Sequence, residues 1–569
     1  MAELIADHLE IPAEERDNFL RKARGEFVSA MASPLESVPS QTSFQQRDDL
    51  PKLEEAHFVG REQELAQLNA FLDRTLTGQG QVVFVVGGPG RGKTALVDEF
   101  TWQALERDAK LVAATGSGNA YSGIGDPYLP FREILGQLTG DVETRWAAGA
   151  IGRTQAQRLW EWMPYTVQAL VSTGPDLIDT FIPGQSVMAR SAAAAGEGAS
   201  WLAQLGVLVA IKPAGQGPVD FQQSDLFEQY AKVMLALTRQ GPLLLVLDDL
   251  QWADTGSINL LFHLGRRLQD SRILIVGVYR PVEVTMGRAG ERHPLEPLVS
   301  EFQRHFGQIL IDLRQAEGRL FVTALLDTEP NRLDKTFQEA LYQHTQGHAL
   351  FTVEILRGMQ ERGDLVQDEA GQWVEGPNLN WETLPARVEG VIGDRIARLP
   401  KMLQKVLEVA SVEGEVFTAE VVARVQAFDE RELVRQLSGN LDKQHRLVVG
   451  QGSQRLGARR LSQYRFRHIL FQHYLYNSLD EVERGYLHEA VAKELEQLYG
   501  EQSADIAGEL ARHFEAAGLF DKAISYLQQA GDRAVRLSAN DEALAHFYKV
   551  LALLETMPDT LEHQRQELR

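Results

Sequence analysis

Cysteine is absent from the 569 residues of this sequence, which excludes disulfide bonds, thiolate metal ligands and cysteine nucleophiles. No apolar run approaches the roughly 18 residues that a membrane-spanning helix needs. The first residues carry scattered acidic side chains and lack the apolar stretch of a secretory signal. We therefore expect a cytoplasmic protein without a membrane partner.

Positive charge is also scarce, because 57 Lys and Arg residues face 79 Asp and Glu residues, giving a net charge of −22. A broad nucleic-acid surface would need a basic stripe against this background. One arginine cluster precedes the C-terminal helices, and it would either contact phosphate or form a solvated turn. Its members are Arg455, Arg459, Arg460, Arg465 and Arg467.

Hydrophobic residues make up 44% of the sequence and charged residues 24%, which is the balance of a globular protein. The length exceeds one ordinary core, so several domains are expected. Residues 1–50 are predicted to be a short helical segment followed by a linker rich in Ser, Pro and Gln.

From residue 58 onward, short apolar runs alternate with helical patterns. Continuous apolar strands separated by helices predict a parallel sheet covered by helices on both faces. The second and third strands lie too far apart for a loop, so a mostly helical insertion is expected over 128–239. This α/β domain is assigned to residues 51–314. Its expected strands are 82–86, 111–114, 243–247, 273–278 and 309–313.

Two further units are predicted next along the chain. Residues 315–384 have a helical pattern with a small hairpin over 365–374, and we assign them as a helical lid. Residues 385–500 combine amphipathic helices with a strand pair around a Gly- and Arg-rich turn. Helices followed by a hairpin suggest a winged-helix domain.

Residues 501–569 are predicted to be helical and to resemble tetratricopeptide (TPR) repeats. The stretch that begins with Asp521 and Ala523 is similar to the one that begins with Asp541 and Ala543. Repeat arrays usually need three or more units, and at most two are visible here. We therefore expect the chain to be part of a longer protein.

A phosphate-binding loop is the strongest motif, because GGPGRGKT matches GxxxxGK[ST] between a predicted strand and a predicted helix. Glycines let backbone N–H groups turn toward phosphate oxygens, and the helix adds its positive dipole end. Lys93 is expected to reach the β- and γ-phosphates, and Thr94 to ligate Mg²⁺. The predicted nucleotide-binding residues are Gly87, Gly88, Pro89, Gly90, Arg91, Gly92, Lys93, Thr94 and Ala95.

Two acids, Asp248 and Asp249, end the buried strand at 243–247. Open α/β sheets bind ligands at the carboxyl ends of their strands. Asp248 is expected to hold Mg²⁺, usually through water, from the strand next to the P-loop strand. Asp249 would orient or deprotonate the attacking water. An ordinary solvated acidic turn is the alternative interpretation of this pair.

Arg280 follows the predicted strand at 273–278. A cation at that edge could sense the γ-phosphate and stabilise charge during phosphoryl transfer. A surface arginine in front of Pro281 is an equal alternative. With Lys93, Asp248 and Asp249, Arg280 completes the predicted catalytic set.

Together these stretches resemble the STAND class of signal-transduction P-loop ATPases, relatives of the AAA+ group. The class includes the bacterial maltose-regulon activator, apoptosome scaffolds and NLR immune receptors. The resemblance covers residues 56–554 and rests on FVGREQEL, the P-loop, LLLVLDDLQWAD and GVYR. Its most specific part is the acidic pair followed by QWAD. It implies a P-loop core, a helical lid, a winged helix and C-terminal TPR repeats.

The resemblance also implies roles for residues outside the loop. A lid motif Gly-x-Pro would touch the nucleotide, but here the stretch is Gly347, His348 and Ala349, so the proline contact is replaced. A winged-helix histidine that touches the ADP β-phosphate corresponds to His468, for which a core or surface histidine is the alternative. The segment expected near the adenine is Phe58, Val59, Gly60 and Arg61.

A switch is what the resemblance implies for function. ADP would hold core, lid and winged helix closed, and an unknown trigger on the C-terminal repeats would favour ATP and an open, self-associating form. Such an ATPase would turn over slowly and regulate transcription or a defence response. Three alternatives stay open: a nucleotide-bound scaffold that never hydrolyses, an AAA+ motor, and a DNA-binding transcription activator.

The N-terminal stretch IADHLEIPAEERDNFLRKARGE resembles the closing helices of a helix-turn-helix domain. It is too short for the whole domain, and a plain helical cap is an equal interpretation. DNA is therefore expected as a partner only through a partial or missing domain.

Overall fold

The computed structural model describes residues 58–118, 126–147, 149–194, 200–211, 222–287, 292–314, 318–377, 379–381, 384–456 and 459–557. The predicted N-terminal helical segment, including its helix-turn-helix remnant, lies outside the described residues. Within these ranges, no helix combines the length and apolar character needed to cross a bilayer.

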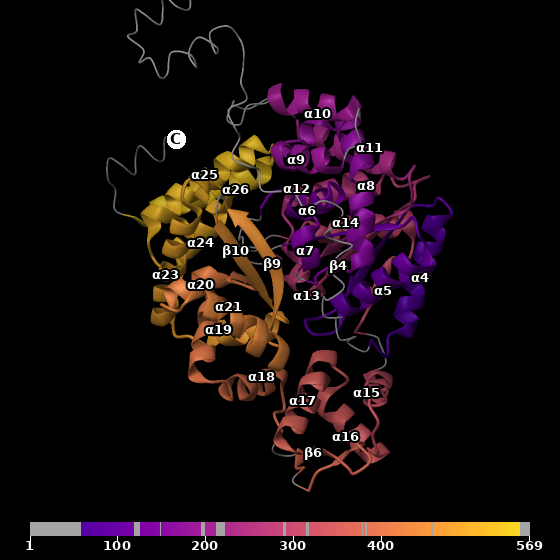
Figure 1. Cartoon of the computed structure of the whole chain (residues 1–569), viewed down its shortest axis with the longest axis vertical. Coiled ribbons are helices and arrows are strands. Elements are labelled where there is room, and N and C mark those ends of the chain that lie inside the picture. The colour runs from indigo at the N-terminus through magenta and orange to yellow at the C-terminus, as the bar shows by residue number, and fades with distance from the viewer. Residues whose placement is uncertain are drawn as a thin grey trace, which may run out of the picture.

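A five-stranded parallel sheet forms the centre of the first unit, as the apolar strand pattern predicts (Figure 1). Nearly all of its strand residues are buried, because helices pack on the sheet. The strands, in the order β2-β3-β4-β1-β5, are β1 Gln81–Val86, β2 Val112–Ser117, β3 Leu243–Asp248, β4 Ile273–Tyr279 and β5 Leu310–Asp312. The helices around it are α4 Glu62–Leu76, α5 Lys93–Arg107, α12 Thr255–Gly265, α13 Pro281–Met286 and α14 Leu295–Phe306.

The strand order corrects one expectation. We expected the strand that ends in Asp248 to lie beside the P-loop strand, but β4 lies between β1 and β3. Val276 of β4 is in register with Val83 on one side and Val246 on the other. The carboxyl end of β4, which leads to Arg280, therefore lies between the P-loop and Asp248.

The predicted insertion is helical and joins the core of the sheet domain. Tyr128, Phe131 and Tyr230 are fully buried there. Tyr128 stacks on Phe181, and Tyr230 meets Phe131 edge to face and Phe181 at a tilt. Its helices are α6 Leu129–Leu138, α7 Glu143–Ala147, α8 Arg153–Thr173, α9 Gly184–Ala194, α10 Ser200–Ile211 and α11 Gln223–Leu237, with a 3-10 turn at Pro175–Leu177.

The segment expected to be a lid has its own small core and stands below the sheet domain in Figure 1. Phe337, Leu341, Ile355 and Met359 are buried in that core. Its helices are α15 Gly318–Leu326, α16 Lys335–Thr345 and α17 Ala349–Arg362, followed by the antiparallel hairpin of β6 Leu365–Gln367 and β7 Trp373–Glu375.

Helices and a three-stranded antiparallel sheet make up the next unit, which we predicted as a winged-helix domain. Its sheet has the order β8-β10-β9, with β8 Val416–Thr418, β9 Val448–Leu456 and β10 Arg459–Phe466. The pair β9 and β10 agrees with the predicted strands, whereas β8 was not predicted. The helices are α18 Val388–Ala397, α19 Lys401–Glu413, α20 Ala419–Val425, α21 Glu430–Gln436, a π-helical segment Leu437–Gln444, α22 Ile469–Ser478 and α23 Glu481–Tyr499.

The C-terminal helices are α24 Ala507–Ala516, α25 Phe520–Arg536 and α26 Asn540–Thr556, after a 3-10 segment Gly500–Ile506. The two similar sequence stretches open α25 and α26, which lie side by side. These helices fold back on the sheet domain, since Leu537, Ala539 and Ala543 belong to its core cluster (Figure 1).

Candidate nucleotide-binding site

The P-loop connects β1 to α5 and has the backbone that its glycines permit. Gly90 and Gly92 have φ angles of 72° and 83°, in the left-handed region that favours glycine. Helix α5 begins at Lys93, so its first N–H groups point toward the loop. Lys93 Nζ donates to the carbonyl oxygen of Gly88 at 3.1 Å. Burial and the nearby Arg280 lower the pKa of Lys93 to about 8, so an anion beside its ammonium would be stabilising.

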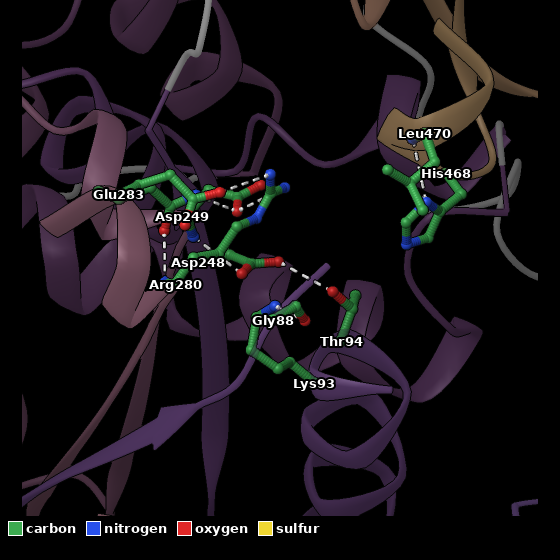
Figure 2. A network of polar contacts seen from close by, with 10 residues as sticks. Gly88, Lys93, Thr94, Asp248, Asp249, Arg280, Glu283, His468 and Leu470 are labelled. Atoms are coloured by element: carbon green, nitrogen blue, oxygen red, sulfur yellow. Dashed lines mark hydrogen bonds and ion pairs between the residues drawn. The ribbon is translucent and has the colours of Figure 1, made fainter. Parts of the chain in front are cut away.

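Thr94 and Asp248 meet at the mouth of this loop (Figure 2). The Thr94 Oγ1 donates to Asp248 Oδ2 at 3.4 Å, and the N–H of Asp249 donates to Asp248 Oδ1 at 2.8 Å. Burial and the neighbouring Asp249 raise the pKa of Asp248 to about 7, which a divalent cation would reverse. A hydroxyl and a carboxylate beside a phosphate loop fit the oxygen ligands that Mg²⁺ prefers.

A third feature of the site is the ion pair between Asp249 and Arg280. The Arg280 Nη2 lies 3.4 Å from Asp249 Oδ1, and its Nη1 lies 3.7 Å from Glu283 Oε1. Arg280 is only 6% exposed, so the alternative of a surface arginine is wrong. Its contact with a γ-phosphate stays a prediction, although β4 brings it between the P-loop and Asp248.

Gln251 is a site residue to which the sequence analysis assigned no role. Its amide nitrogen donates to Asp249 Oδ1 at 2.6 Å, and its amide oxygen accepts the N–H of Arg280 at 3.0 Å. The side chain is 1% exposed, and these two hydrogen bonds hold Asp249 and Arg280 in position. Gln251 is part of the QWAD stretch that follows the acidic pair, and this stretch was the available signal.

The segment at Phe58 to Arg61 packs beside the P-loop and the first lid helix. Gly60 has a φ of 69°, and a Cβ there would lie 2.8 Å from the Cα of Phe321. Arg61 is buried, with its Nη2 donating to the Arg91 carbonyl at 3.4 Å. Phe58 packs against the core of the sheet domain, and Val59 is half-buried. The adenine contact of this segment stays a prediction.

The start of α17 docks on the P-loop. The Nε2 of His348 lies 3.0 Å from the Pro89 carbonyl oxygen, and the N–H of Leu350 donates to the Gly90 carbonyl at 3.0 Å. Burial and the nearby Arg91 lower the pKa of His348, which favours a neutral ring. Ala349, at the position of the family proline, faces Gly92.

His468 faces the same site from the following unit. It caps α22, with the N–H of Leu470 donating to its Nδ1 at 3.1 Å. Burial, Arg280 and Lys93 lower the pKa of His468 to about 3, so the ring is neutral. Figure 2 shows His468 on a different segment from Thr94 and Lys93, apart from both. The structure thus brings His468 to the predicted site, and its contact with a phosphate stays a prediction.

A polar cavity of about 1670 Å³ extends from Asp248 and Asp249 between the sheet domain, the β8-β10-β9 unit and the C-terminal helices. Its walls include Glu415 and Arg465, of which only Arg465 was singled out from the sequence. Arg460 also lines the cavity, while Arg467 forms an ion pair with Asp442. Members of the predicted arginine cluster therefore lie in different environments: Arg460 and Arg465 line the cavity, whereas Arg467 pairs with Asp442.

Known proteins resemble this chain either in sequence or in structure. A protein of Rhizobium meliloti (strain 1021), itself named uncharacterised, is 24% identical over 512 residues. That match covers 88% of this chain but 43% of the relative, so the chain spans less than half of the relative's length.

Solved structures show a looser likeness. A STAND protein with a tetratricopeptide repeat sensor from Pyrococcus horikoshii is 14% identical, with a TM-score of 0.39, over 90% of this chain and 66% of that one. The ORC1 protein of Aeropyrum pernix, solved in complex with DNA, is 16% identical with a TM-score of 0.29, over 75% of this chain and 95% of its own. Cdc6p from Pyrobaculum aerophilum is 15% identical with a TM-score of 0.30, over 80% and 99%.

TM-scores this low give no information about the site. The assignment therefore rests on the match to a protein family and on the geometry of the P-loop. The match is to the AAA ATPase domain family and covers residues 57–276. These residues contain β1 to β3, the first part of β4, the P-loop and both acids of the site. The chain therefore carries an AAA ATPase domain over residues 57–276, and its α/β core is that of a P-loop ATPase.

Proposed function

We propose that this chain is a STAND-type switch ATPase that holds ADP in a closed form, hydrolyses ATP slowly and self-associates when it opens. One observation carries the proposal: three units of the same chain meet at the P-loop. The sheet domain supplies the loop itself, the lid places His348 on Pro89, and the winged-helix unit brings His468 to face Lys93.

The residues of the core fit the nucleotide chemistry. The N–H groups at the start of α5 and the Lys93 ammonium would bind the phosphates, and Thr94 with Asp248 would hold Mg²⁺. Bound Mg²⁺ supplies charge neutralisation to the phosphate oxygens. Asp249, held by Gln251, would orient the attacking water, and Arg280 would offer positive charge to the γ-phosphate.

The closed arrangement explains why the ATPase would be a switch. A ligand shifts a conformational equilibrium only by binding one form better than the other. His348 and His468 approach the site only while the lid and the winged-helix unit are folded onto the core. A diphosphate that contacts these units would hold the chain closed. The trigger would act on the C-terminal helices, because α25 and α26 also pack on the core.

The test begins with the purified chain. Heat-released nucleotide is identified by chromatography, and ADP is the expected species. Isothermal titration then measures ATP and ADP binding with Mg²⁺, and phosphate release is followed for the wild type, Lys93→Ala and Asp249→Asn. Lys232→Ala, at an exposed lysine of α11, is the control.

We expect Lys93→Ala to lose nucleotide binding and Asp249→Asn to keep binding but lose phosphate release. Lys232→Ala should behave as the wild type. Absence of adenine nucleotide both after purification and in the titration would contradict the proposal. Binding without any phosphate release in the wild type would favour the inert scaffold, and stable hexamers with fast turnover would favour the motor.

A further inference from the structure

Glu415 reaches the ATPase site from the winged-helix unit. It lies between the end of α19 and the start of β8, and its carbonyl oxygen accepts the N–H of Phe466 at 2.9 Å. The next residue, Val416, is in register with Arg465 of β10. The backbone at Glu415 is therefore fixed by the sheet, and its side chain shares the wall of the polar cavity with Asp248 and Asp249.

Two carboxylates and two guanidinium groups gather in this place. Burial and Asp249 raise the pKa of Glu415, while Arg465 and Arg280 act in the opposite direction. Glu415, Asp249 and Arg465 all line the polar cavity, and Arg280 lies 3.4 Å from Asp249. The Nε atoms of Arg280 and Arg465 are buried without a hydrogen-bond partner among the described residues.

The position of Glu415 matters because of what lies next to it. Lys93 and the start of α5 would bind the β- and γ-phosphates, and Asp249 with Arg280 would lie on the γ-phosphate side of the site, where the attacking water would be. Glu415, which lines the same cavity as Asp249, would therefore add negative charge on the side of the site where the third phosphate would lie. Like charges in a partly buried site repel strongly, because solvent screens them poorly.

We infer that Glu415 is a specificity-determining residue that makes the closed form prefer a nucleoside diphosphate to a triphosphate. This inference rests on the proposed nucleotide function. Arg465 has the opposite effect, because its charge offsets that of Glu415. The closed form therefore senses the γ-phosphate through a residue of the winged-helix unit, in addition to Arg280 of the core.

The experiment measures the affinities of ADP and of a non-hydrolysable ATP analogue by isothermal titration with Mg²⁺. Glu415→Gln should raise the affinity of the triphosphate relative to ADP by about tenfold or more. Arg465→Met should shift the same ratio toward ADP, because Glu415 is then less compensated. Glu481→Gln, at an exposed position of α23 in the same unit, should leave the ratio unchanged.

The opposite signs of the two variants separate this inference from a structural effect. A general loosening of the closed form would move both variants in one direction, and that result would overturn the inference. An unchanged ratio in Glu415→Gln would overturn it as well. If Glu415→Gln does not fold, Glu415→Asp must keep the wild-type ratio and Arg465→Met must still shift toward ADP, or the inference fails. A wild type that binds neither nucleotide refutes the proposed function itself.

Discussion

The imidazole of His348 contacts the carbonyl oxygen of Pro89, with its Nε2 at 3.0 Å. The N–H of Phe351 donates to the Nδ1 of the same ring at 3.3 Å, so Nδ1 accepts and Nε2 carries the proton. One neutral side chain therefore caps α17 and at the same time binds the P-loop. This ring joins the start of α17 to the phosphate loop, and we expect a change in one to affect the other.

Replacing His348 tests this coupling. His348→Ala removes the cap and the bond to Pro89, which should lower the free energy of unfolding by about 1–2 kcal/mol. It should also speed the release of bound ADP, because the lid is less firmly held. Stopped-flow release of a fluorescent ADP and urea unfolding measure the two effects. His305→Ala, at an exposed histidine of α14, is the control. Unchanged ADP release would contradict the coupling.

Gly90 is expected to tolerate no side chain. Its φ of 72° costs an alanine about 1 kcal/mol or more, and a Cβ would come within 2.6 Å of the His348 Cε1. Gly90→Ala should therefore destabilise the protein and displace the lid. In the double variant with His348→Ala, the clash with the imidazole disappears, whereas the 2.9 Å approach to the Leu350 Cβ and the backbone cost remain. A double-mutant cycle on the unfolding free energy measures this difference, and strict additivity would contradict it.

Stability of the C-terminal docking should depend on pH through Glu542. Its Oε1 accepts the N–H of Gly256 at 3.0 Å, at the start of α12, which Asp254 also caps. Burial and the nearby Asp254 raise the pKa of Glu542 to about 7, with Asp541 adding to the same effect. The folded pKa is thus above the 4.5 of an ordinary glutamate. The docked form binds the proton more tightly than the undocked form does.

The sign follows directly from this shift. Docking is fully stabilised below pH 4.5, weakens as pH rises through 7, and changes little above that. We expect α25 and α26 to exchange amide hydrogens more readily at pH 8 than at pH 5.5, after correction for the intrinsic rate. Glu542→Gln should remove most of this difference, and Glu555→Gln, near the end of α26, should not. Equal protection of wild-type α26 at both pH values would contradict the prediction.

The sequence predicted those features whose signals are local. GGPGRGKT and the apolar run that ends in Asp248 each act within one strand and its turn, and both lie where expected. The position of β4 between β1 and β3 could not be predicted, because apolar strands of a buried sheet carry no mark of their neighbours. Strand β8 was missed because Val416–Thr418 is only three residues long and lies between helices.

Contacts between the units could not be predicted from the sequence, and the reason is similar. An amphipathic helix indicates that one face is buried but not against what. Ala523 and Ala543 therefore suggested repeat helices, whereas the packing of Ala543 on the sheet domain had no sequence signal. The sequence did not indicate a role for Glu415 for the same reason, because that role depends on how one unit packs on another.

Gln251 should be required for catalysis more than for binding. Its amide joins Asp249 to the backbone of Arg280. Gln251→Ala leaves Asp249 free to rotate, so we expect phosphate release to fall about 10- to 100-fold. Affinity for ADP with Mg²⁺ should change less than about threefold.

Gln240→Ala, in the turn before β3, is the matched control. Single-turnover hydrolysis and isothermal titration give the two numbers, and a parallel loss of both would mean that Gln251 supports the fold rather than the positions of Asp249 and Arg280.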